Sequence, residues 1–308
     1  MATIYTDVPN NWSELEPYVN KGRFAEAIFT KKKCFFYDAC SFRYHAGMNP
    51  ASVAPILEYI KDQDGMIVIT RCILMELASG SGILNPEYIR YCQKISQSGI
   101  SLYVIYEEDL FQIMGSCFST NASVNSFLVW AVRMMKGPIS TITKTLDEKE
   151  SLNDVVIKGR NLDHQGIYKS FFTAVRANKE SKDNLGEELL GICLHILSQL
   201  PGEEDGKFCI ITDDKEAAGK IDALFKKTKR QFQGKRIILF STPKLAYILY
   251  DKEYVTDRDQ LVAMLKHGGS GNIKVLGTQI YDLKSNEISL SCEELADQIM
   301  SKSIHIIL

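Results

Sequence analysis

Short apolar runs that alternate with helical patterns constrain the fold of this chain most strongly. Strand-like runs occur at 35–38, 66–70, 101–106, 208–212 and 236–240. Segments 51–61 and 86–96 lie between the first three runs and carry apolar residues at helical spacing. Strands that alternate with helices in this way are typical of a parallel sheet covered by helices. The sequence therefore predicts an α/β fold with a doubly wound, mostly parallel sheet.

The spacing of these runs also predicts how the chain is organised. Residues 107–183 contain no convincing strand pattern, whereas 123–135 and 165–177 have strong helical patterns and 141–158 is polar and charged. We therefore expect 107–183 to be a helical insertion in a core formed by 31–106 and 184–266. Residues 1–30 are expected to form a short helical segment that precedes this core.

A separate C-terminal extension is expected at 267–308. The glycine-rich segment 267–272 has the composition of a flexible joint, and it lacks the Lys-Ser/Thr that follows in a phosphate-binding loop. Beyond it, 273–281 and 287–290 flank Lys284-Ser285-Asn286 and predict a hairpin, and 293–300 predicts a helix. The extension is therefore expected to be a small α+β unit.

Four acidic residues follow strands or open helices in this pattern. Asp38 follows the first apolar run, and Glu76 lies about one helical turn beyond the second. Glu187 opens an apolar helix, and Asp214 follows the fourth run. The carboxyl ends of parallel strands form one edge of a sheet, so these side chains are expected to gather there. Clustered carboxylates repel one another unless a cation lies between them, which predicts a Mg²⁺ or Mn²⁺ site for phosphoryl transfer.

Composition narrows the class of protein. The 308-residue chain is 45% hydrophobic and 24% charged, with a net charge of −2, so it lacks the overall basic charge of many nucleic-acid-binding proteins. Its eight cysteines occur singly, without the spacing of a zinc site. They are expected to be buried thiols in a reducing compartment. No signal-peptide pattern or membrane-spanning stretch is present, which predicts a cytoplasmic protein with no membrane association.

Four segments around the acids resemble the PIN-domain family of metal-dependent ribonucleases. They are YDACSF (37–42), TRCILMELAS (70–79), NLGEELLGICLHIL (184–197) and IITDDKEAAGKI (210–221). The resemblance covers roughly 33–105 and 184–250, and the gap between the second and third acids is longer than in the family. It implies an endoribonuclease that uses Mg²⁺ or Mn²⁺ to cleave RNA and leave a 5′-phosphate.

The resemblance also implies roles for individual residues. Asp38 and Asp214 are expected to be the inner ligands, Glu76 a ligand or water-positioning residue, and Glu187 an outer or second-metal ligand. Asp213 is the alternative to Asp214. Each acid also has a purely structural alternative, because Asp is common where a helix begins and Glu is favoured in a first turn.

Several residues near the acids are candidates for orienting them or for contacting RNA. Thr212 is expected to orient Asp214, and Ser41 to orient Asp38 or a phosphate. Arg43 and Arg71 are expected to neutralise phosphate near the metal, and Lys226 and Lys227 belong to a basic run suited to an RNA backbone. Two histidines are assigned elsewhere: His45 is expected on a surface loop, and His195 within an apolar helix as a core or interface residue.

Other functions remain open on sequence alone. A phosphatase or 5′-nuclease of another α/β class is one alternative, although Ala39 and Cys40 after Asp38 depart from the D-x-D pattern of haloacid-dehalogenase enzymes. A non-catalytic PIN-like binding or regulatory module is the other. The insertion suggests a toxin or defence nuclease controlled by a protein partner or by homodimerisation. Trp130, Phe171 and Phe172 are candidates for that interface.

Overall fold

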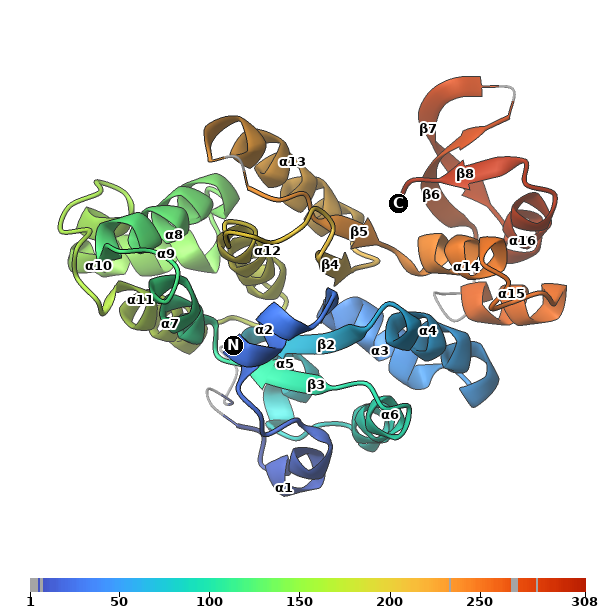
Figure 1. The fold of residues 1–308 in the computed structure, drawn as a ribbon, viewed down its shortest axis with the longest axis horizontal. Helices are drawn as coiled ribbons and strands as arrows, with labels where there is room; N and C mark the ends of the chain where they lie inside the picture. Colours follow the sequence, from blue (N-terminus) through green and yellow to red (C-terminus); the bar gives the residue numbers. More distant parts are fainter. Residues whose placement is uncertain (1–4, 6–7, 233, 267–270, 281) are drawn as a thin grey trace.

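The computed structural model describes residues 5, 8–232, 234–266, 271–280 and 282–308. Its centre is a five-stranded, all-parallel sheet in the order β3-β2-β1-β4-β5 (Figure 1). The strands are β1 (Lys33–Tyr37), β2 (Gly65–Thr70), β3 (Leu102–Ile105), β4 (Phe208–Ile211) and β5 (Ile238–Phe240). The prediction of an α/β fold with a mostly parallel sheet is therefore confirmed.

The central strands are apolar throughout because helices cover both faces of the sheet. Alternate residues of β1 enter two different cores: Phe35 and Tyr37 enter one, and Cys34 and Phe36 enter the other. A strand that is buried on both faces has a near-continuous apolar sequence, which explains why β1 and β2 stand out so clearly.

The helices divide between these two cores. One core is closed mainly by α3 (Ala39–Gly47), α4 (Pro50–Asp62), α6 (Pro86–Gln97), α14 (Thr242–Asp251) and α15 (Arg258–Lys266). The other is closed mainly by α8 (Asn121–Met135), α11 (Ile167–Ala177) and α12 (Leu185–Leu197), and α13 (Lys215–Gln231) also contributes to it. Helix α5 (Arg71–Ala78) follows β2 directly and contributes to both. Several helices begin after a residue whose side chain caps the first turn: Asn49 caps α4 and Ser241 caps α14.

The segment between β3 and β4 is helical. After the 3₁₀ turn η3 (Glu107–Asp109) it forms α7 (Leu110–Gly115), α8, α9 (Thr141–Glu148), α10 (Glu150–Val156) and α11 (Ile167–Ala177), and α12 then leads to β4. The polar stretch 141–158 thus forms two short helices. A buried ion pair between Arg176 and Glu107 joins α11 to η3.

The two ends of the chain add smaller elements. At the N-terminal end these are α1 (Trp12–Leu15), the 3₁₀ turn η1 (Glu16–Tyr18) and α2 (Phe24–Thr30). A further 3₁₀ turn, η2 (Ser79–Ser81), follows α5 in the central part of the chain. At the C-terminal end, β6 (Ile273–Gln279), β7 (Asp282–Leu290) and β8 (Ile304–Ile306) form an antiparallel sheet in the order β7-β6-β8, with α16 (Cys292–Met300) before β8. No helix among the described residues is long and apolar enough to cross a membrane.

The C-terminal hairpin differs in detail from the prediction. Gln279 pairs with Asp282, so Lys284-Ser285-Asn286 lie inside β7 and not in the turn. The small polar residues that indicated a turn are tolerated in β7 because it is an edge strand whose residues 284–287 are exposed. Most of the predicted glycine-rich joint, 267–270, lies outside the described residues.

Candidate metal centre

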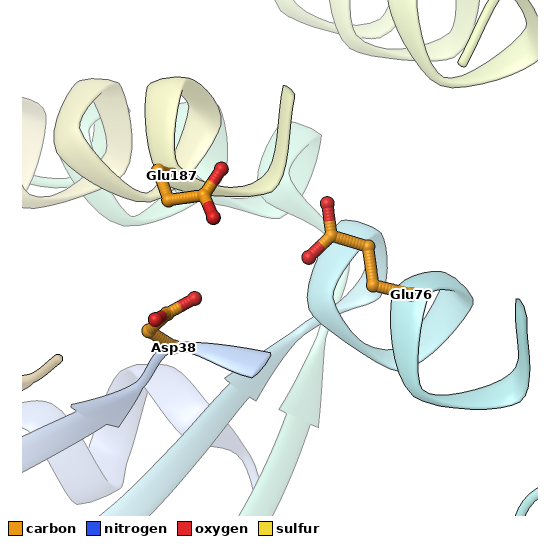
Figure 2. Close-up of side chains that lie close together, drawn as sticks. All are labelled: Asp38, Glu76 and Glu187. Carbon is orange, nitrogen blue, oxygen red and sulfur yellow. The ribbon is translucent and has the colours of Figure 1, made fainter. Parts of the chain in front are cut away.

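Three carboxylates from distant parts of the chain meet at the carboxyl edge of the parallel sheet. They belong to Asp38, Glu76 and Glu187, and one oxygen from each lies within 4.8 Å of the others. Figure 2 shows them directed into a common space, Asp38 from the end of β1, Glu76 from α5 and Glu187 from α12. The structure thus brings together three of the four acids singled out by the sequence.

Asp38 is fully buried and held in a fixed orientation. It occupies the position before α3, but its side chain makes no cap bond to that helix. Instead, the Thr212 hydroxyl donates to Asp38 Oδ2 at 3.1 Å, while Oδ1 has no partner among the described residues. Burial, followed by repulsion from Glu76, raises the pKa of Asp38 to about 7. A helix-capping role therefore does not account for this carboxylate.

Glu76 is anchored by a buried lysine. Lys179 Nζ lies 2.7 Å from Glu76 Oε1 and also pairs with Asp183, and the Gly186 backbone N–H donates to the same Glu76 oxygen at 3.1 Å. Burial raises the pKa of Glu76, and the Lys179 charge opposes that rise. These contacts fix the carboxylate toward Asp38 and Glu187 and neutralise part of the cluster's negative charge.

Glu187 lies in the first turn of α12 and faces the other two acids. Its Oε2 is buried and has no partner among the described residues. Burial is the main cause that raises its pKa to about 8, followed by repulsion from Glu76 and Asp38. The helix macrodipole favours a negative charge at this position. Because the pKa is nevertheless raised, the effects of burial and of the neighbouring acids outweigh that of the macrodipole.

The two aspartates after β4 have different positions. Asp214 accepts a hydrogen bond from Ala217 N–H at 2.9 Å and so caps α13, although its charge also helps to raise the pKa of Asp38 and Glu187. Asp213 accepts hydrogen bonds from Ser41 Oγ at 2.7 Å and from Thr242 N and Oγ1 at 2.6 and 2.7 Å. Asp214 thus borders the triad, whereas Asp213 holds the starts of α3 and α14 together.

Ser41 and Thr212 form hydrogen bonds with other acids than those expected from the sequence. Ser41 is buried and donates to Asp213, so the expected contact with Asp38 is not formed. Thr212 donates to Asp38 and also accepts from Asp214 N–H at 3.2 Å, so it links both acids. A hydroxyl can donate once and accept elsewhere, which lets one threonine serve two neighbours.

The two arginines also differ in position. Arg43 is exposed and donates to the Glu76 backbone carbonyl at 2.8 Å, next to the centre. Arg71 is buried, with its guanidinium 4.0 Å from the centre of the Tyr106 ring and 5.9 Å from that of Trp12. The expectation that Arg71 contacts phosphate is therefore wrong in this structure, because its charge packs against aromatic rings in the interior.

One histidine assignment is wrong and the other is confirmed. His45 is fully buried in α3, not on a surface loop, and its ring nitrogens lie 2.8 Å from Tyr37 Oη and 3.1 Å from Thr242 Oγ1. His195 is buried in α12 and stacks on Trp130 with ring centres 5.1 Å apart, as expected for a core residue.

Two further sets of predicted contact residues lie away from the triad. Lys226 and Lys227 are exposed on α13, where Lys226 pairs with Asp222. Phe171 and Phe172 are fully buried in the same core as residues of α8 and α12, so they are not available for the partner interface suggested by the sequence. Their apolar character reflects packing.

Lys179 is the main residue of the centre that the sequence did not reveal. It follows α11 and is 3% exposed, yet it carries a charge because Glu76 and Asp183 both face it. The attraction of these acids outweighs the cost of burial and raises its pKa. The Lys179–Asp183 spacing of four residues was the only available signal, and it is common on exposed surfaces.

Gly186 fits against Glu76 so closely that its lack of a side chain is required. A Cβ at this position would lie 2.5 Å from Glu76 Oε1. We therefore expect Gly186→Ala to displace the Glu76 carboxylate and weaken Mn²⁺ binding, by about 10- to 100-fold as for other changes that misplace a metal ligand. Calorimetric titration with Mn²⁺ measures this. Gly219→Ala in α13, where no atom lies near the added Cβ, is the matched control, and equal affinities in the two variants would contradict the expectation.

Comparison of the chain with known protein families, with curated proteins and with solved structures finds no match.

Proposed function

We propose that this chain is a metal-dependent endoribonuclease with a PIN-like fold, in which Asp38, Glu76 and Glu187 hold Mg²⁺ or Mn²⁺. The observation that carries the proposal is the pair of buried carboxylate oxygens, Asp38 Oδ1 and Glu187 Oε2, without partners in the described part of the chain. Buried carboxylates are costly unless they are paired or bind a metal. A cation between them removes that cost.

The donor set fits a hard divalent cation. All three side chains offer carboxylate oxygens, and no histidine or cysteine among the described residues belongs to the group. Mg²⁺ and Mn²⁺ take oxygen ligands, whereas zinc sites are usually built from nitrogen and sulfur. When bound, such a metal lowers the pKa of a coordinated water and stabilises negative charge on a phosphate.

The residues around the triad prepare it for this chemistry. Thr212 holds Asp38, and Lys179 with the Gly186 N–H holds Glu76, so two of the three carboxylates are oriented before a substrate arrives. Arg43 lies at the exposed side of Glu76, where its guanidinium can contact a phosphate oxygen. Preorganised charges of this kind contribute to catalysis because they need not reorganise during the reaction.

Two features agree with the PIN-like assignment. The sheet is wholly parallel, and three of the acids that carry the family resemblance meet at its carboxyl edge. Asp214 departs from the role that the resemblance implies, since one of its oxygens caps α13. We therefore assign it to the border of the centre, where it increases the negative charge that attracts the cation.

Cleavage of labelled single-stranded RNA with Mn²⁺, Mg²⁺ or EDTA tests the proposed function. We expect cutting with either metal, none with EDTA, and a 5′-phosphate on the downstream product. Absence of cutting under all three conditions, with Mn²⁺ binding intact, would instead favour a non-catalytic metal-binding module.

A further inference from the structure

A cavity of about 320 Å³ lies between the parallel sheet and the C-terminal sheet. Thr212, Asp213 and Asp214 line it from the end of β4, and Ile273 and Lys274 line it from β6. Asp214 also lines a smaller cavity that contains Glu187. Asp214 therefore lies between the larger cavity and the metal centre, and the C-terminal extension forms one wall of that cavity.

The cavity has the chemistry to receive a nucleotide. Its volume is at the lower end of the range for small-molecule sites, which suits one nucleotide and excludes a duplex. Lys215, in the first turn of α13, and Lys274 bring positive charge to it, while Tyr44 and Pro243 offer surfaces for a base. Bases stack readily on aromatic side chains, and lysines bind phosphate through charge alone.

Both acids that line the cavity accept hydrogen bonds within the protein. The Asp213 carboxylate accepts hydrogen bonds from Ser41 and Thr242, and Asp214 caps α13. Lys215 and Lys274 instead share an exposed partner, Glu287 on β7, at 3.5 and 3.1 Å. Exposed ion pairs contribute little stability, so a phosphate can replace Glu287 without large cost.

We propose that this cavity binds the nucleotide of a single-stranded RNA that adjoins the scissile phosphate, with Lys215 and Lys274 contacting its phosphate group. The proposal rests on the proposed nuclease function. It gives the C-terminal extension a role in RNA binding, since β6 supplies Lys274 and β7 supplies Glu287, which pairs with both lysines in the absence of RNA. Glu287 then competes with the substrate phosphate for the same two ammonium groups.

Binding of a short fluorescein-labelled single-stranded RNA, followed by anisotropy, tests the proposal. Measurements use the full chain with Asp38→Asn in all proteins, so that the RNA is not cut. We expect Lys215→Gln/Lys274→Gln to raise Kd by about tenfold and to make the salt dependence shallower by ~0.7 for each phosphate that is no longer neutralised. Glu287→Gln is expected to lower Kd, because it removes the competing acid.

The matched control is Lys61→Gln/Lys252→Gln, which removes the same charge from exposed positions on α4 and after α14. Its Kd should change by no more than about twofold, as expected from a screened, distant charge. Equal Kd values for the two double variants, an increase in Kd for Glu287→Gln, or no RNA binding by the parent protein would each overturn the proposal.

Cleavage by the protein with Asp38 intact separates this inference from the proposed function. Metal-dependent cutting with an unchanged KM in Lys215→Gln/Lys274→Gln would support the proposed nuclease function and contradict the proposed nucleotide site. RNA binding that depends on the two lysines, without cutting by the wild type, would support the nucleotide site and contradict the nuclease function.

Discussion

Replacement of Asp38 by Asn is expected to reduce metal-dependent RNA cleavage by about a thousandfold or more. Asn keeps the shape of the side chain and can still accept from Thr212, but it removes the negative charge of the buried carboxylate. A metal contributes several kcal/mol of transition-state stabilisation, and each 1.4 kcal/mol corresponds to about a factor of ten in rate. Single-turnover cleavage of a labelled RNA in saturating Mn²⁺ measures the loss.

The matched control for this variant is Asp251→Asn, which changes the same groups at an exposed position at the end of α14. It should cleave RNA at the wild-type rate. A similar rate for Asp38→Asn and Asp251→Asn would remove Asp38 from the reaction, and with it the proposed centre.

The second large effect is expected in the stability of the metal-free protein. The pKa of Asp38 is raised from 3.8 to about 7 and that of Glu187 from 4.5 to about 8, so the folded state binds these protons more tightly than the unfolded chain. The contribution of these two carboxyl groups to the free energy of unfolding should therefore fall as the pH rises from about 4 to about 8 and then level off. At ~1.4 kcal/mol per pKa unit, Asp38 alone accounts for about 4 kcal/mol.

Asp38→Asn should remove the share of that dependence that comes from Asp38. In EDTA at pH 8 the variant is expected to be more stable than the wild type by about 4 kcal/mol, and at pH 4 by much less. Urea unfolding across this pH range provides the measurement. Wild-type and Asp38→Asn stability curves that run parallel across this pH range would show that Asp38 is charged at little cost, contrary to the structure.

The sequence was sufficient to predict the sheet and the meeting of its acids. Strands buried on both faces leave continuous apolar runs, and a parallel sheet places their carboxyl ends together, so the position of Asp38 followed from simple rules. The prediction for Glu76 and Glu187 relied on the helices that follow or precede those strands, and the structure brings both to Asp38.

The errors have a common physical cause: sequence does not show which partner a polar group finds. Arg71 was expected to contact phosphate and His45 to lie on a surface loop, but aromatic rings and hydroxyls in the interior accommodate them. Ser41 was expected to orient Asp38 or a phosphate, but it donates a hydrogen bond to Asp213. Lys179 was not identified because its partner Glu76 lies more than 100 residues away in the chain. Such pairings depend on tertiary structure and leave no local pattern.

Direct titration of metal-free protein with Mn²⁺ tests the central claim that the three carboxylates form a metal centre. Calorimetry of the wild type should show saturable binding, and Asp38→Asn/Glu187→Gln should abolish it, because the two oxygens without protein partners are those that the cation needs. Mn²⁺ binding of equal affinity in the double variant would contradict the account, since the metal would then be held elsewhere.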